Sequence, residues 1–111
     1  MSQAEPIHPR LDVNYGSIEE VQSAYLPFFK SGGLFVSTNQ GYELNQTIIL
    51  NVDLPTIPRP IEVYTLVGWK VPFGASSWGP EGIGLSFTGH TGEALKRCIE
   101  EMMKDAFAGH N

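Results

Sequence analysis

The spacing of apolar residues changes several times along the chain, and each change predicts a new element. Residues 11–15 alternate between apolar and polar positions, which is typical of a short strand. Ser17 and Glu20 have the spacing of a helix-capping pair, so we expect a short helix that stops before Pro27. From Gly33 the apolar period becomes two again, which indicates a second strand.

Three further stretches alternate in the same way, at residues 47–54, Ile61–Val71 and 83–88. In the longest of them we expect Val63, Val67, Trp69 and Val71 to share one face. The last stretch carries apolar residues at helical spacing, which predicts an amphipathic helix capped at Thr91. Short strands without long helices between them predict a mainly β fold, a small antiparallel barrel with the C-terminal helix across one opening.

Length and composition place the chain in a narrow class. Its 111 residues suffice for one domain, which we assign to residues 11–111, with residues 1–10 as a flexible tail. The net charge of -5 disfavours nucleic acid as a partner. No apolar run approaches the roughly 20 residues that span a bilayer, so we expect no membrane insertion. The start of the chain lacks the apolar region of a signal peptide, and a single Cys fits a reducing compartment, so we expect a cytoplasmic protein.

The residues offer little catalytic chemistry. Cys98 falls on the apolar stripe of the last helix, and the three histidines, His8, His90 and His110, are far apart in sequence and lack a neighbouring nucleophile motif. A zinc site needs clustered Cys and His ligands. We therefore expect a protein that is not an enzyme, with no catalytic, cofactor-binding or metal-binding residues.

Aromatic residues and a glycine pair are the more informative features. Trp78 lies in a loop rich in Gly and Ser, where it either contacts a partner or covers the barrel mouth. Phe35, Phe87 and Phe107 are expected in the core. Gly32 and Gly33 follow Lys30 and form either an anion cradle or a sharp corner into the next strand, and they lack the ending of a Walker loop.

Two stretches, "AYLPFFKSGGLFVST" and "VGWKVPFGASSWGPEGIGLSF", resemble the PilZ domain family. Within that family they are most similar to the branch that acts in type IV pilus assembly. The resemblance extends over nearly the whole chain from Leu11, and its specificity comes from the spacing of Trp69, Pro72, Gly74, Ala75, Gly82 and Gly84. It implies a six-stranded antiparallel barrel with a short N-terminal helix and a C-terminal helix.

Most PilZ domains bind cyclic di-GMP through an Arg-x-x-x-Arg segment and an Asp/Asn-x-Ser-x-x-Gly turn. If Gly33 is the last residue of that turn, Phe28 and Lys30 occupy the positions of its polar residues, and no two arginines of the chain are four apart. The resemblance therefore predicts a degenerate ligand motif, with Gly32 and Gly33 as a corner. The alternative is a receptor with a divergent site that uses Arg10, Lys30 and Arg59.

The pilus-assembly branch implies an adaptor in twitching motility. Its members bind the pilus extension ATPase PilB and the EAL domain of FimX, and FimX senses cyclic di-GMP, so the messenger acts indirectly. The resemblance, together with the loop position of Trp78, gives the expected partner-binding residues, which are Tyr25, Leu26, Phe28, Trp69 and Trp78. Gln22 stands where the branch has a Tyr.

Overall fold

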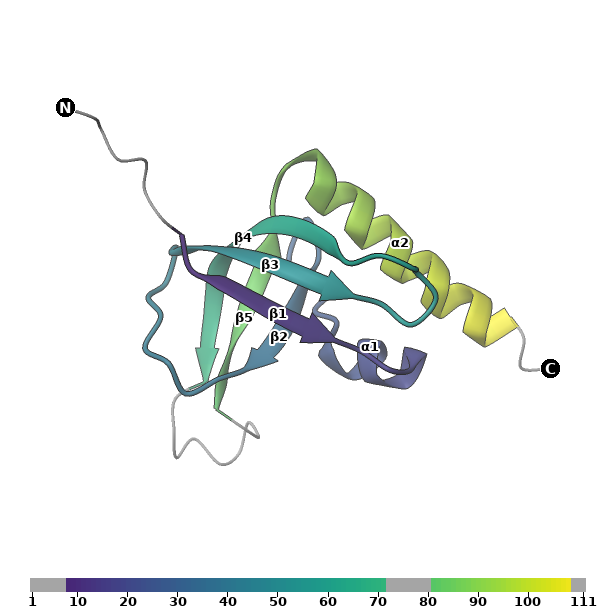
Figure 1. Ribbon diagram of the computed structural model, residues 1–111, viewed down its shortest axis with the longest axis horizontal. Coiled ribbons are helices and arrows are strands. Elements are labelled where there is room, and N and C mark those ends of the chain that lie inside the picture. Colours follow the sequence, from purple (N-terminus) through teal and green to yellow (C-terminus); the bar gives the residue numbers. More distant parts are fainter. Residues whose placement is uncertain (1–7, 72–80, 109–111) are drawn as a thin grey trace.

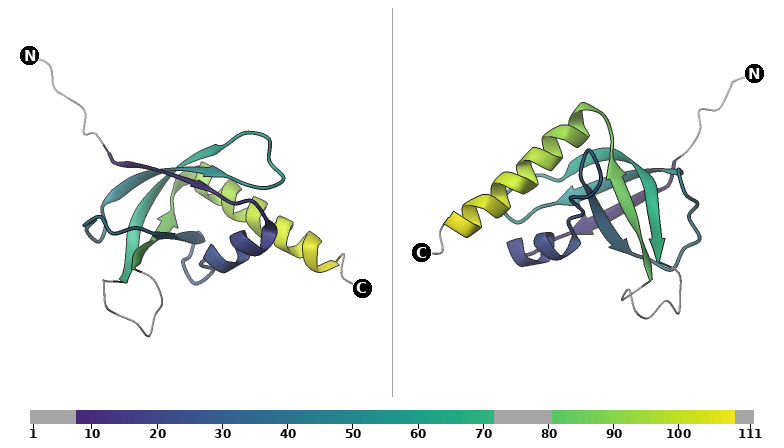
Figure 2. Two further views of the ribbon diagram at one scale, coloured as in Figure 1. Left: turned by 60° about the horizontal axis from the view of Figure 1, so that its bottom comes forward. Right: turned by 180° about the vertical axis from the view of Figure 1, so that it is seen from behind.

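The computed structural model describes residues 8–71 and 81–108. Its elements, in chain order, are β1 (Arg10–Asn14), α1 (Ile18–Ala24), β2 (Gly33–Ser37), β3 (Thr47–Asp53), β4 (Ile61–Val71), β5 (Gly82–Phe87) and α2 (Gly89–Ala108). The strands form one curled sheet, and both helices lie toward one end of it (Figures 1 and 2). The predicted mainly β, barrel-like fold with two helices is confirmed.

The order of the strands in the sheet is β1-β3-β4-β5-β2. The pairs β3–β4, β4–β5 and β5–β2 are antiparallel, but β1 runs parallel to β3, with Arg10 opposite Ile49 and Asn14 opposite Asp53. The described residues thus form five strands where we expected six, and one pair differs from the antiparallel expectation. Alternation along residues 10–14 identifies a strand but carries no information on its neighbour or direction.

The alternating patterns of the two central strands are confirmed by burial. Even-numbered residues of β3 from Ile48 to Val52 are buried, and the odd-numbered residues between them are only partly covered. In β4, the buried residues Val63, Thr65 and Val67 alternate with exposed ones. The buried hydroxyl of Thr65 donates a hydrogen bond to the Ile48 carbonyl at 2.8 Å, so no polar group of this side chain is left unpaired.

The N-terminal end of α1 is capped largely as the sequence predicts. Ser17 Oγ accepts a hydrogen bond from the Glu20 backbone N–H at 3.3 Å. The Glu20 carboxylate reaches one residue further back than in the usual capping box, and accepts from the Gly16 N–H at 2.8 Å. The helix ends at Ala24, where the chain turns to an extended conformation at Tyr25, so its last residue is three positions before the expected breaker Pro27.

The core fills the inside of the curled sheet. Residues that are almost completely buried come from α1 (Val21), from the strands (Leu34, Leu50, Leu85, Phe87) and from α2 (Leu95, Ile99). The apolar stripe of α2 therefore packs on the sheet as predicted, although the helix begins at Gly89, two residues before Thr91. Among the residues that the structure describes, no helix is both long and apolar enough to cross a membrane.

Candidate functional site: an aromatic cluster on the outer face of the sheet

Four aromatic side chains gather on the face of β2, β4 and β5 that points away from the core. This aromatic cluster consists of Phe28, Phe29, Phe35 and Trp69. The ring centroids of Phe28 and Phe29 are 4.8 Å apart, and the Phe28 and Trp69 rings meet edge to face at 5.9 Å. The ring centroids of Phe35 and Trp69 are also 5.9 Å apart. These distances are those of favourable aromatic pairs, so the rings hold one another in place.

Glycines form the floor beneath the aromatic cluster. A Cβ added at Gly68 would lie 2.8 Å from the Phe29 ring, and one added at Gly82 would lie 2.5 Å from Phe35 Cζ. Such contacts are too short for any side chain, so the rings rest directly on the backbone of the sheet. Gly33 lies under Phe29 in the same way, with a Cβ distance of 2.6 Å, whereas a Cβ on Gly84 would lie 3.2 Å from Trp69, a tight contact that is less restrictive.

A β-bulge turns Trp69 toward this outer face. Val67 pairs with Leu85, but the next pair is Trp69 with Gly84, so β4 has one residue more than β5 at Gly68. The extra residue reverses the alternation, because paired residues point to the same side of a sheet. Our expectation that Trp69 and Val71 share a face with Val67 was therefore wrong. A single glycine inside a strand pattern suggests a bulge, so Gly68 was the feature of the sequence from which this bulge could have been predicted.

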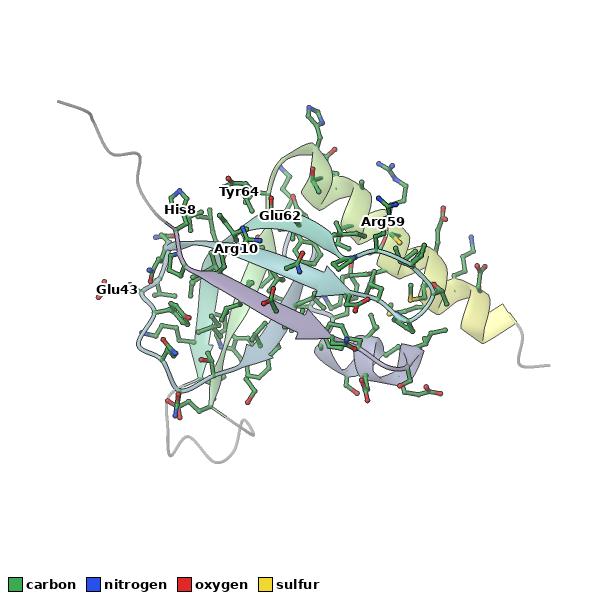
Figure 3. The ribbon with its side chains drawn as sticks, in the orientation of Figure 1. His8, Arg10, Glu43, Arg59, Glu62 and Tyr64 are labelled. Carbon is green, nitrogen blue, oxygen red and sulfur yellow. The ribbon has the colours of Figure 1, made fainter. Side chains whose placement is uncertain are left out.

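Phe28 is the most exposed member of the aromatic cluster. Its exposed fraction is 65%, although it contacts two other rings. The apolar surface continues along the outer face of β4 to Leu66 and Tyr64, whose exposed fractions are 37% and 52%. Figure 3 shows Tyr64 beside His8, whose ring it meets edge to face at 6.2 Å. Exposed apolar side chains on one face of a sheet are typical of protein-binding sites.

Two of the expected partner-binding residues lie beneath the surface. Tyr25 is buried, and its hydroxyl donates a hydrogen bond to Glu100 Oε2 at 2.6 Å, which ties the segment before β2 to α2. Burial, followed by the bond to Glu100 and its charge, raises the pKa of Tyr25 well above its ordinary value. Leu26 is also buried and lies on Gly84 next to Trp69. Tyr25 therefore belongs to the core, whereas Leu26 packs beside the aromatic cluster, and direct contact of either residue with a partner stays a prediction.

The other aromatic expectations had mixed outcomes. Phe87 is buried in the core, as expected. Phe35 is only partly buried and belongs to the aromatic cluster, because its neighbours Leu34 and Val36 take the inward positions of β2. Sequence reasoning also missed Phe29, whose position next to Phe28 gave no sign of the glycine floor. Trp78 lies outside the described residues.

The positions of the degenerate ligand motif are accounted for by packing. Gly32 has φ of 76°, a backbone conformation that favours glycine, at the corner where the chain enters β2. A Cβ on Gly33 would lie 2.3 Å from the Leu85 carbonyl oxygen, so this glycine is needed for the close approach of β2 and β5. Phe28 belongs to the aromatic cluster, and Lys30 is exposed at the rim of a shallow groove beside α2.

The arginines considered for a divergent site lie apart. Arg10 Nη1 forms an ion pair with Glu62 Oε2 at 2.8 Å, across the first three strands of the sheet order, and both side chains are about half exposed. Figure 3 shows this pair near the start of β1, whereas Arg59 lies toward the other end of β3 in the connection to β4. The structure thus does not bring Arg10 and Arg59 together.

The described residues offer no cluster for other chemistry. In residues 8–71 and 81–108, no three His, Cys, Asp or Glu side chains are grouped so as to hold a metal ion. Burial, with a smaller effect of the Glu101 charge, raises the pKa of the Cys98 thiol. A thiol with a raised pKa is a poor nucleophile at neutral pH.

Comparison with known proteins agrees with this architecture. A scan against protein-family models matches the PilZ domain over residues 6–104. No curated protein matches the chain in a sequence search. PilZ domains are binding domains that act in cyclic di-GMP signalling as receptors or adaptors. Because the match extends over most of the 111 residues, this chain belongs to the PilZ domain family.

Proposed function

We propose that this PilZ domain is a cytoplasmic adaptor in type IV pilus assembly and twitching motility. It binds the pilus extension ATPase PilB and the EAL domain of FimX through the aromatic cluster. Cyclic di-GMP reaches it only through FimX. The observation that carries the proposal is the exposed Phe28 ring, held against Phe29 and Trp69 on a floor of glycines.

The aromatic cluster has the properties of a binding hot spot. Its rings are held by one another and by the sheet, so few side-chain rotations are lost when a partner binds. Aromatic residues are enriched among the few residues that contribute most of the binding energy of an interface. The adjoining surface of Leu66 and Tyr64 extends the apolar area along β4.

The residues at the ligand-motif positions favour an adaptor over a receptor. Phe28 has no polar side-chain atom with which to bind a guanine edge, and its ring is engaged with Trp69. Arg10 is engaged with Glu62. A specific observation nevertheless favours the alternative of a receptor with a divergent site, because Lys30 shares its groove with Lys96 and Arg97. Two acidic side chains, Glu93 and Glu100, line the same groove and oppose the binding of a phosphate.

Two measurements on the wild-type chain test the proposal. Isothermal titration with cyclic di-GMP should show no binding, and titration with the FimX EAL domain, loaded with cyclic di-GMP, should show a complex. A parallel titration with PilB should also show binding. Direct binding of the dinucleotide with micromolar affinity would overturn the adaptor proposal in favour of the receptor.

A variant then locates the surface. Trp69→Ala should weaken binding to both proteins, with Leu44→Ala as the matched control, because Leu44 is 57% exposed and lies in the connection between β2 and β3. Circular dichroism establishes that each variant is folded. If folded Trp69→Ala binds both proteins as the wild type does, the aromatic cluster is not the site.

A further inference from the structure

The strands β1 and β2 are the two edges of the sheet, and among the described residues no further strand pairs with either of them, although Tyr25 forms an isolated antiparallel bridge with Leu34 of β2. In β2, the bonds from Thr38 N–H to the Glu81 carbonyl and from Phe87 N–H to the Gly32 carbonyl fix the register. The backbone N–H and C=O groups of the even-numbered residues of β2 therefore point toward β5. The backbone groups of Phe35 and Ser37 face the opposite way, toward the free edge.

The same reasoning applies to β1. Its ladder with β3 includes the bonds from Ile49 N–H to the Pro9 carbonyl and from Tyr15 N–H to the Asp53 carbonyl. The backbone N–H and C=O groups of the odd-numbered residues of β1 thus point toward β3, and those of Asp12 and Asn14 point away from it. The free edge of β1 offers the same kind of backbone groups as that of β2.

Both free edges border one groove, which we call the edge groove. It has a volume of about 400 Å³, and its lining includes Asp12 and Asn14 of β1 and Phe35 and Ser37 of β2. The end of the β2 edge from Gly33 to the Phe35 N–H is already covered by the segment before β2, since Tyr25 forms an antiparallel bridge with Leu34 and Leu26 N–H donates to the Gly33 carbonyl at 2.9 Å. The open part of the edge therefore begins at the Phe35 carbonyl and continues through Ser37, where it borders the groove.

The backbone groups on its two sides determine what the edge groove fits. An extended chain presents N–H and C=O groups on both of its sides, so it can bond to β1 and β2 together. A helix uses these groups internally and cannot. The alternation of strand directions around the sheet makes β1 and β2 antiparallel to each other, so an added strand would be parallel to one and antiparallel to the other.

The charge of the edge groove defines the side chains of its occupant. Asp12 and Glu20 line it, and none of the described lining residues is Lys or Arg. We propose that the edge groove binds a short extended segment of a partner protein that carries Lys or Arg, and that this segment becomes a sixth strand between β1 and β2. The inference depends on the two free edges and their charge, and holds whatever the identity of the partner.

The probe is a synthetic octapeptide in which Lys alternates with Val, compared with one in which Glu alternates with Val. We expect the Lys peptide to bind at concentrations of about 1 mM or below, and to shift the backbone amide signals of Asp12, Asn14 and Ser37 in NMR spectra. The Glu peptide should bind at least about tenfold more weakly. Absence of binding by the Lys peptide, or signal changes confined to other residues, would overturn the proposal.

Variants separate backbone pairing from charge. Asp12→Pro removes one N–H from the free edge without touching the ladder to β3, and should weaken the Lys peptide about tenfold more than Asp12→Ala does. Glu20→Lys should weaken it while leaving the backbone intact. Equal affinities for Asp12→Pro and Asp12→Ala would contradict strand addition. Sedimentation of the protein without peptide tests whether the groove is occupied by a second copy of this chain. If the protein dimerises and Asp12→Pro abolishes the dimer, the occupant is another copy of this chain and the proposed partner segment is ruled out.

Discussion

Replacement of Phe28 by Ala separates binding from stability more cleanly than any other change in the aromatic cluster. A buried Phe covers roughly 200 Å². With 65% exposed, roughly 130 Å² of Phe28 remains for a partner to cover and roughly 70 Å² already rests on its neighbours. At about 25 cal/mol per Å², these areas correspond to about 3 kcal/mol of binding and at most about 2 kcal/mol of folding stability.

The expected result is a loss of affinity of about 100-fold for Phe28→Ala, since each 1.4 kcal/mol is about a factor of ten. Calorimetric titration of the FimX EAL domain measures the affinity, and urea denaturation measures the free energy of unfolding. Leu44→Ala, at a similarly exposed position outside the aromatic cluster, should change the affinity less than about twofold. If Phe28→Ala remains folded and binds within about twofold of the wild type, the exposed ring is not an anchor, and its exposed area does not contribute the expected binding free energy.

Three predictions concern the scaffold, each measured by urea denaturation. Gly33→Ala places a Cβ 2.3 Å from the Leu85 carbonyl oxygen and should lower the free energy of unfolding by about 3 kcal/mol. The control Gly41→Ala adds a Cβ with no atom within 4 Å and should change this free energy by less than about 0.5 kcal/mol. Similar effects of the two substitutions would refute the close approach of the Gly33 and Leu85 backbones. Thr65→Val loses the bond to a carbonyl and should cost about 1 kcal/mol, and an unchanged value would show that this bond does not stabilise the fold. Burial and, less strongly, the charge of Glu20 raise the pKa of Tyr15 to about 12. The stability that the neutral Tyr15 contributes is therefore complete below about pH 10 and is lost as the pH rises toward 12. Tyr15→Phe should make the fall in the free energy of unfolding over this pH range smaller, and an equally steep fall in the variant would contradict the prediction.

The sequence allowed much of the fold to be predicted where one face of a strand is buried. In β3, burial of Ile48, Leu50 and Val52 makes a slip of one residue costly, so alternation alone defines the strand. The parallel pairing of β1 could not be predicted in this way. Its partner residues lie about 39 positions away, as from Arg10 to Ile49, and no local pattern encodes that pairing or its direction.

The candidate site was predicted only in part, for a similar reason. The resemblance drew attention to Phe28 and Trp69, and the structure brings these two rings together. Phe29 and Phe35 were missed because their exposure depends on glycines that lie far away in sequence, such as Gly68 and Gly82. Aromatic residues in an apolar run look like core residues until the opposite strand is known to lack side chains.

The extra residue at Gly68 has a consequence for how sequences of this family should be compared. Beyond that point Lys70 lies opposite Ile83, and Trp69 takes the place next to Gly84. An alignment without a gap at Gly68 would match exterior positions of this chain to interior positions of a relative that lacks the bulge. The insertion or deletion of a single codon there would exchange the inward-facing and outward-facing side chains at the end of β4. Evolution can therefore create or remove an exposed aromatic surface without substituting any of the residues that follow.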